Sequence, residues 1–176
     1  IRRPPRSTLS SSSAASDVYK RQAIDIDPSK FIRAEELGAT HCFDSRNNDT
    51  IEEIRALTNG GVDYAIDLAG VIPAMNTAYQ IIRYGGSVIT AGLSPINTQF
   101  SFNHSDLVAQ EKSILGSYMG SCVPVRDVPR FLNLFKQGRL PVDKLIDGKI
   151  TFDDLNEGFD KLSKGEVVRQ ILMPNA

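Results

Sequence analysis

Apolar and polar residues follow two different periods along residues 23–176, and the change from one to the other predicts a regular order of strands and helices. Short apolar runs bounded by turn residues are typical of buried strands. Runs of this kind are AIDID, THCFD, VDYAIDLAG, GGSVITAG and SILGSYMG. Between them, apolar residues recur every three or four positions over residues 31–37, 51–57 and 73–83, the spacing of a helix face. Strands that alternate with helices indicate crossover connections and a parallel sheet, so we expect a doubly wound α/β fold.

Polar residues and glycines mark the expected ends of these helices. Asp27 followed by Pro28 is typical of a helix start, because the carboxylate can accept a bond from a free backbone amide. Gly38 fits the end of the same helix. Thr50 and Glu53 have the spacing of a capping box, which predicts the start of the second helix.

The pattern changes after the last of the five runs. Residues 127–137 place apolar side chains on one helical face, and residues 143–173 give a strand, a helix and a final strand pattern. This tail has no place in a simple alternation of strands and helices. We therefore expect the sheet domain to occupy residues 23–137 and residues 138–176 to belong to a second, incomplete domain.

Residues 1–22 differ from the rest in being rich in serine and arginine and free of glycine. A transit peptide fits poorly, because Pro4 and Pro5 oppose an amphipathic helix. The segment DVYKRQ can be back-translated into the end sequence of a transposon adapter used in DNA library preparation. We interpret residues 1–22 as a non-native, disordered leader and exclude them from the fold.

The composition excludes several classes of function. The chain has 20 basic and 21 acidic residues, and the leader holds five of the former and one of the latter, so the remainder carries about five net negative charges. An acidic body without a basic stripe argues against nucleic acid as a partner. No apolar run approaches the roughly 18 residues that span a membrane. Cys42 and Cys122 lie too far apart to indicate a disulfide framework or a zinc knuckle, so we expect a cytoplasmic protein.

Asp25 is the first candidate binding residue. It ends a predicted strand just before a helix, where dinucleotide folds hold the adenosine ribose through a carboxylate. A 2′-phosphate about 4 Å away would cost roughly 4 kcal/mol at an effective dielectric of 20, so the carboxylate favours NAD over NADP. Asp25 could instead cap the helix, but Asp27 fits that role better. The glycine fingerprint expected roughly 20 residues earlier is missing, since no glycine precedes Gly38.

Two further strands end in small residues. Leu68-Ala69-Gly70 and Ala91-Gly92-Leu93 stand where ligands bind in open α/β sheets, although ordinary strand-to-turn glycines explain them as well. Arg169 could bind a phosphate or be a solvated surface arginine. His41 and His104 have no apparent acid or nucleophile partner, so no catalytic or metal-binding cluster is predicted.

Taken in order, these segments resemble the zinc-dependent alcohol dehydrogenases of the medium-chain dehydrogenase/reductase superfamily. The likeness covers essentially all of residues 23–174 and is carried by AIDIDPSKFIRAEELGAT, GGVDYAIDLAG, GGSVITAGL, ILGSYMGSCVPVRDVPRF, GRLPVDKLI and NEGFDKLSKGEVVRQIL. The resemblance implies that residues 23–137 form a partial NAD-binding Rossmann domain and that residues 138–176 return to the catalytic domain. The chain would then be the C-terminal portion of an oxidoreductase that transfers a hydride between an alcohol/aldehyde pair and NAD.

The resemblance also implies roles for single residues. Asp25 and Lys30 would bind the adenosine ribose. Leu68 and Ala69 would line the adenosine side of the cofactor, and Gly92 and Leu93 the nicotinamide side. Tyr118 and Met119 would lie on a strand whose backbone meets the carboxamide. Arg169 would contact the pyrophosphate. In this family the strand around Ser117–Gly120 lies close to a subunit interface, which implies a homo-oligomer.

The family's catalytic zinc is held by residues that precede the glycine fingerprint, and no segment here matches them. We therefore expect no metal ligands in this chain and no activity from it alone. In the strand order 3-2-1-4-5-6 the first strand is central, so a sheet that lacks it leaves AIDID and VDYAIDLAG with unpaired edges. Such a chain is expected to aggregate or to be partly molten.

Three other interpretations remain open at this point. A zinc-free quinone reductase of the same superfamily would have no zinc ligands upstream. A methyltransferase fold also ends a strand with a ribose-binding acid, but would bind S-adenosylmethionine. A non-catalytic nucleotide-sensing module would bind NAD without turnover.

Overall fold

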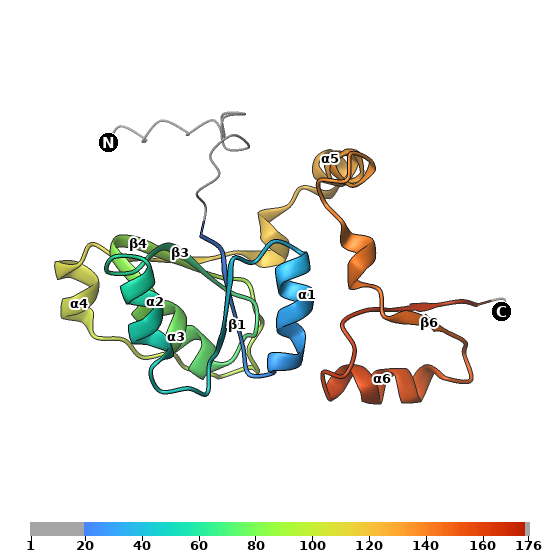
Figure 1. The fold of residues 1–176 in the computed structure, drawn as a ribbon, viewed down its shortest axis with the longest axis horizontal. Helices are drawn as coiled ribbons and strands as arrows, with labels where there is room; N and C mark the ends of the chain where they lie inside the picture. The colour runs from blue at the N-terminus through green and yellow to red at the C-terminus, as the bar shows by residue number, and fades with distance from the viewer. Residues whose placement is uncertain (1–19, 175–176) are drawn as a thin grey trace. The chain divides into compact units, whose positions relative to one another are not determined.

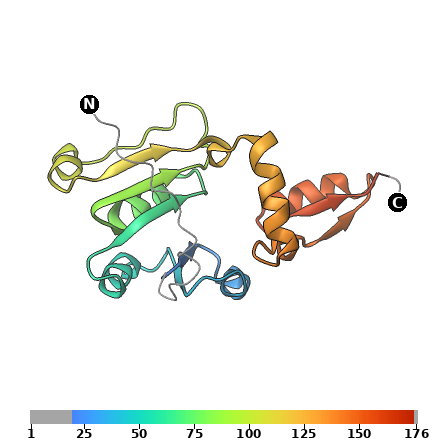
Figure 2. The same ribbon diagram turned by 90° about the horizontal axis from the view of Figure 1, so that it is seen from above.

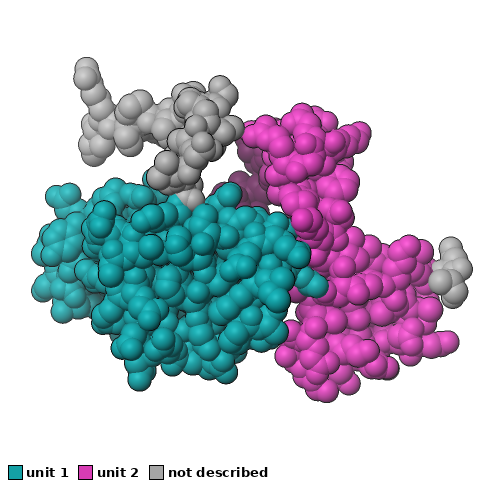
Figure 3. Space-filling view, viewed as in Figure 1, with its two compact units in different colours: residues 1–116 teal, residues 117–176 magenta. Residues whose placement is uncertain are grey.

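The computed structural model describes residues 20–174, which belong to two compact units. The units divide between Gly116 and Ser117, and Figure 3 shows them in different colours. Most of the predicted leader, residues 1–19, lies outside the described part of the chain. Gln22 is the first residue of a strand, so the disorder expected of residues 1–22 is wrong at that position.

The first unit contains the expected alternation of strands and helices (Figure 1). Its elements are β1 (Gln22–Asp25), the 3-10 turn η2 (Pro28–Lys30), α1 (Phe31–Glu36), β2 (His41–Asp44), α2 (Thr50–Leu57), β3 (Val62–Asp67), α3 (Ile72–Ile81), β4 (Ile82–Thr90), α4 (His104–Ala109) and β5 (Ser113–Gly116). All strand pairs are parallel: β1 pairs with β2, and β3, β4 and β5 lie side by side in that order (Figure 2). The predicted doubly wound α/β fold is confirmed.

The sheet of the first unit is interrupted between β1 and β3. β1 is hydrogen-bonded only to β2, and β3 only to β4, so the described strands form a two-stranded and a three-stranded sheet. The break falls where a doubly wound sheet has its first strand. This arrangement confirms the expected truncated sheet, with one free edge on each side of the break.

The hydrophobic core covers one face of the three-stranded sheet. Ile54 of α2 and Met75 of α3 pack there against Ala65 of β3 and Val88 of β4. Ile24 of β1 packs against the same core, which places the two sheets over one interior. The other face of β3 is exposed and apolar, because residues along a strand point alternately to its two faces. The exposed residues there are Tyr64 and Ile66.

The structure confirms one of the two predicted helix caps and contradicts the other. Asp27 accepts a hydrogen bond from the Ser29 amide at 3.0 Å, which confirms the predicted cap of η2. The capping box predicted for α2 is wrong, because Asp49 is the N-cap residue and makes no side-chain cap. The buried Thr50 hydroxyl donates instead to the Asp44 carbonyl at 2.7 Å. A buried hydroxyl needs an acceptor, and the last carbonyl of β2 supplies one.

The second unit is smaller and has its own parallel strand pair. Its elements are the turn η3 (Tyr118–Ser121), α5 (Pro124–Lys136), the turn η4 (Val142–Leu145), β6 (Gly148–Ile150), α6 (Leu155–Ser163) and β7 (Gln170–Leu172), with β6 parallel to β7. Helix α5 groups with this unit rather than with the sheet of the first unit. That residues 23–137 form one partial NAD-binding domain stays a prediction. Among the described helices, none is long and apolar enough to cross a membrane.

Candidate functional site

The carboxyl end of β1 brings together the two residues expected at a ribose. Asp25 is the last residue of β1, and its Oδ1 accepts a hydrogen bond from the Asp27 amide at 2.9 Å. Lys30 Nζ lies 3.4 Å from the same oxygen. The two side chains are 37% and 38% exposed, so the pair is open to solvent and could still accept a ligand's hydroxyl groups.

The end of β2 adds a second ion pair that the sequence did not single out. Asp44 is the register partner of Asp25, and the Ser45 amide donates to the Asp25 carbonyl at 3.1 Å. Arg46 donates to Asp44 through its Nε at 3.0 Å and its Nη2 at 2.7 Å. These bonds lower the pKa of Asp44 to about 2, so both groups are charged at neutral pH. The available signal was an acid at the end of a strand parallel to β1, with an arginine two residues later.

The ends of β3 and β4 are joined through Asp67, a third residue that the sequence analysis missed. Its side chain is only 5% exposed, and Oδ1 accepts from the amides of Ala69 and Gly70 at 3.0 and 3.2 Å. Oδ2 accepts from the Thr90 hydroxyl at 2.9 Å. A buried carboxylate is stable only when its oxygens are paired in this way. Asp67 therefore fixes the turn after β3 against β4.

Two glycines let the turns after β3 and β4 approach each other. A Cβ atom on Gly92 would lie 2.2 Å from the Gly70 nitrogen, and one on Gly70 would lie 2.8 Å from the Leu93 carbonyl oxygen. Gly70 also has a φ of +66°, which disfavours side chains. The Ser94 hydroxyl donates to the Gly70 carbonyl at 2.7 Å and closes the contact. The glycines are therefore required by packing, whatever else they do.

The residues beside these glycines are open to solvent. Leu68 is 75% exposed and Leu93 is 79% exposed, while Ala69 is exposed at the same turn as Leu68. Exposed leucines at the carboxyl ends of neighbouring parallel strands form an apolar surface where an open α/β sheet binds its ligands. Six of the nine predicted residues thus belong to the first unit, in two groups: Asp25 with Lys30, and the four residues at these turns.

Tyr118 and Met119 do not lie on a strand, contrary to expectation. β5 ends at Gly116, and the two residues form part of the turn η3 in the second unit. Met119 and Gly120 both have left-handed backbone angles, with φ of 49° and 67°, and two such residues in sequence cannot continue a strand. Tyr118 and Met119 are largely exposed, at 72% and 70%.

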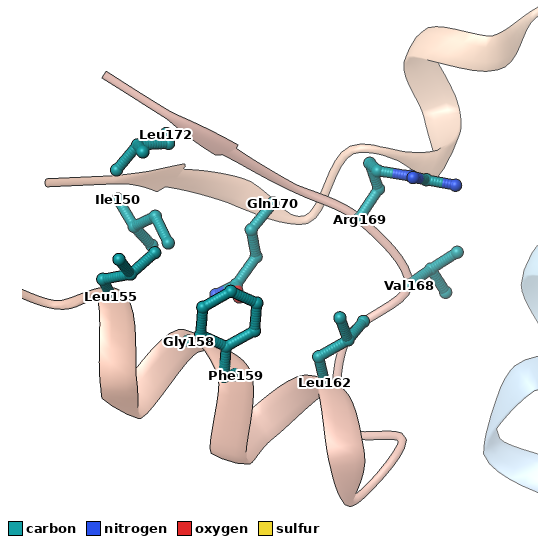
Figure 4. A pocket seen from close by; sticks show the side chains of 9 residues that line it. All are labelled: Ile150, Leu155, Gly158, Phe159, Leu162, Val168, Arg169, Gln170 and Leu172. Atoms are coloured by element: carbon teal, nitrogen blue, oxygen red, sulfur yellow. The ribbon is translucent and has the colours of Figure 1, made fainter. Parts of the chain in front are cut away.

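Arg169 directly precedes β7 in the second unit and is exposed. Its amide donates to Asp147 Oδ2 at 3.2 Å, and the Asp147 amide donates back to the Arg169 carbonyl at 2.8 Å. A pocket of about 290 Å³ lies between α6 and the strands β6 and β7, and Arg169 is at its edge (Figure 4). Its side chain points away from Phe159 and Leu162, so the guanidinium does not fill the pocket (Figure 4). Throughout residues 20–174, no three metal-ligating side chains come together.

Comparison with known families decides the descent of the chain. Residues 17–137 match the profile of a family described as zinc-binding dehydrogenase, which is more than half of the sequence. The chain belongs to the zinc-binding dehydrogenase family. The match ends at residue 137, where the sequence analysis placed the end of the sheet domain. The family assignment confirms the resemblance and opposes a methyltransferase.

Relatives of this zinc-binding dehydrogenase chain are named as alcohol dehydrogenases. It is 30% identical over 152 residues to alcohol dehydrogenase 1 of Cenchrus americanus, covering 85% of the chain and 40% of the relative. Benzyl alcohol dehydrogenase of Acinetobacter calcoaceticus has a similar structure, with 30% identity, a TM-score of 0.81, and coverage of 86% of this chain and 41% of that one. A protein of Sinorhizobium meliloti 1021 with bound NADP is 26% identical, with a TM-score of 0.75 and coverage of 87% and 44%. The chain thus spans about two fifths of the length of the relatives it matches.

Proposed function

We propose that the chain is the nucleotide-binding part of an NAD-dependent oxidoreductase that interconverts alcohols and aldehydes. The observation that carries the proposal is the pair formed by Asp25 and Lys30 at the carboxyl end of β1. Family membership and relatives named as alcohol dehydrogenases support the reaction class and favour an alcohol over a quinone as substrate. The zinc of such an enzyme would be held outside this chain, and the chain alone would not turn over an alcohol.

The Asp25 carboxylate would accept hydrogen bonds from the two ribose hydroxyls of the adenosine, and Lys30 would donate to the same ribose. The donor set fits, because the carboxylate is partly exposed and is oriented by the Asp27 amide. The same charge repels a 2′-phosphate, which supports NAD although one structural neighbour holds NADP.

The turns after β3 and β4 would line the rest of the nucleotide. Leu68 and Ala69 would contact the adenosine side, and Gly92 and Leu93 the nicotinamide side. The exposure of Leu68, Ala69 and Leu93 supports this placement, because a ring can lie against them. The bound nicotinamide would supply the hydride chemistry, and these residues would only position it.

The roles of Tyr118, Met119 and Arg169 rest on the resemblance alone. Their exposure in the second unit is consistent with a role in binding, and the left-handed turn at Met119 presents its backbone differently from a strand. The cytoplasmic location, the homo-oligomer and the absence of nucleic-acid or membrane partners likewise stay predictions from the sequence.

Replacing the ribose carboxylate tests the proposal. Asp25→Asn keeps the acceptor for the Asp27 amide but removes the charge, so we expect NAD to bind about tenfold more weakly or worse, since bonds to charged groups are the strong ones. Equilibrium dialysis with labelled NAD measures the dissociation constant. Asp63→Asn is the matched control, because Asp63 is the second residue of β3 and lies near the amino end of that strand. Equal affinity of the wild type and Asp25→Asn for NAD would refute the ribose role.

A further inference from the structure

Five charged groups gather where β1 and β2 end. They are the carboxylates Asp25, Asp27 and Asp44 and the cations Lys30 and Arg46. Their formal charges sum to −1. The cluster therefore contains two cations that could bind a phosphate, yet as a whole it repels one.

The backbone holds the two strand ends in fixed register. Asp25 and Asp44 are paired residues of adjacent parallel strands, and the Ser45 amide is bonded to the Asp25 carbonyl at 3.1 Å. Arg46 follows Ser45 directly, so its backbone lies two residues beyond the register partner of Asp25. Its charge also reaches the turn after β1: the Ser29 hydrogen bond is the main cause of the lowered pKa of Asp27, with Lys30 and Arg46 contributing through their charges.

Asp44 determines where the Arg46 guanidinium lies. Both oxygens of Asp44 accept from the guanidinium, through Nε at 3.0 Å and Nη2 at 2.7 Å, in the bidentate geometry that suits the two groups best. Oδ1 also accepts from the Arg46 backbone amide at 2.9 Å. Arg46 is nevertheless 63% exposed, and within residues 20–174 its guanidinium is hydrogen-bonded to Asp44, while Asp27 acts on it through charge alone.

We propose that Asp44 is a second determinant of cofactor choice, which holds Arg46 in an ion pair and so withholds it from a 2′-phosphate on the adenosine ribose. The inference rests on the proposed function, because it places the ribose at Asp25. Asp25 repels the phosphate directly, while Asp44 neutralises Arg46, which could otherwise bind it. The ligand class at issue is an adenosine nucleotide with or without a 2′-phosphate.

The test compares 5′-AMP with adenosine 2′,5′-bisphosphate, which differ only in the 2′-phosphate, on the full 176-residue chain. Asp44→Asn keeps Oδ1 as acceptor for the Arg46 amide and thus the turn, but releases Nη2. We expect the preference for 5′-AMP to fall about tenfold, the usual effect of one new charge-assisted hydrogen bond. Adding Arg46→Gln to Asp44→Asn should restore the preference.

Asp63→Asn is the matched control. It releases Arg83 from an ion pair of 2.6 Å at the other end of the sheet, so it changes the net charge equally without providing a cation near the ribose. An unchanged preference in Asp44→Asn while 5′-AMP still binds would overturn this inference and leave the proposed function intact. A gain that persists in the double variant would overturn it as well. If 5′-AMP binds neither to the wild type nor to Asp44→Asn, the proposed function fails and this inference fails with it.

Discussion

The 176-residue chain is expected to unfold over a broad temperature range rather than in one sharp transition. Its buried hydrophobic core has only eight residues in the described part of the chain, all of them in the first unit. A unit that buries so little apolar surface is marginal, because burial must offset the conformational entropy lost on folding.

The interrupted sheet lowers the stability further. Among the described strands, none pairs with the facing edges of β1 and β3, and each backbone group that is buried without a partner costs about 1–3 kcal/mol. The exposed face of β3 adds an apolar surface next to a free edge, because Tyr64 and Ile66 are 70% and 64% exposed. Parallel sheets are normally covered on both faces, so this surface favours association between copies of the chain.

Differential scanning calorimetry measures the breadth of the transition directly. We expect a calorimetric enthalpy that exceeds the van't Hoff enthalpy, and light scattering that rises before the midpoint. A single sharp transition with equal enthalpies would show that the open edge is tolerated, and the expectation of a partly molten chain would be wrong.

Gly92→Ala is expected to separate the turns after β3 and β4. The new Cβ would lie 2.2 Å from the nitrogen and 2.6 Å from the Cα of Gly70, and backbone atoms cannot move aside as a flexible side chain can. Such overpacking costs about 3 kcal/mol. A marginal unit cannot absorb this cost, so the bonds from the Ala91 and Gly92 amides to the Asp67 carbonyl should be lost.

Hydrogen exchange followed by mass spectrometry reports this change locally. In Gly92→Ala, amides of residues 67–70 and 91–94 should exchange as fast as in an unstructured peptide. Gly116→Ala is the matched control, since Gly116 ends β5, has an ordinary φ, and a Cβ there meets nothing within 4 Å. Wild-type protection at both turns in Gly92→Ala would show that the two glycines are not in forced contact.

The order of elements in the first unit was predictable except for α4, because each of the other strands and helices has a clear hydrophobic period. The cap at Asp27 was predictable too, since it depends on neighbouring residues only. Thr50 shows where this local reasoning ends: its hydroxyl bonds to a residue of the preceding strand, and no capping rule includes tertiary partners. The end of β5 was missed for another reason, because left-handed angles at Met119 are unusual for a residue with a side chain.

The residues of the candidate site also differ in whether the sequence could predict them. Asp25 was recognisable from its position at the end of a strand and Lys30 from the resemblance, and the two side chains do meet. Asp67 was missed because its importance arises from a contact with Thr90 at the end of a neighbouring strand, which the sequence alone does not reveal. Arg46 was missed although its partner Asp44 stands only two residues before it.

Hydrogen exchange of the 176-residue chain with and without NAD is the most direct test of the claim that these strand ends bind the nucleotide. We predict slower exchange on adding NAD in residues 25–30, 68–70 and 92–94, and no change in residues 58–61 at the amino end of β3. Protection that is absent from residues 25–30, or that appears only at the amino ends of the strands, would contradict a ribose site at Asp25.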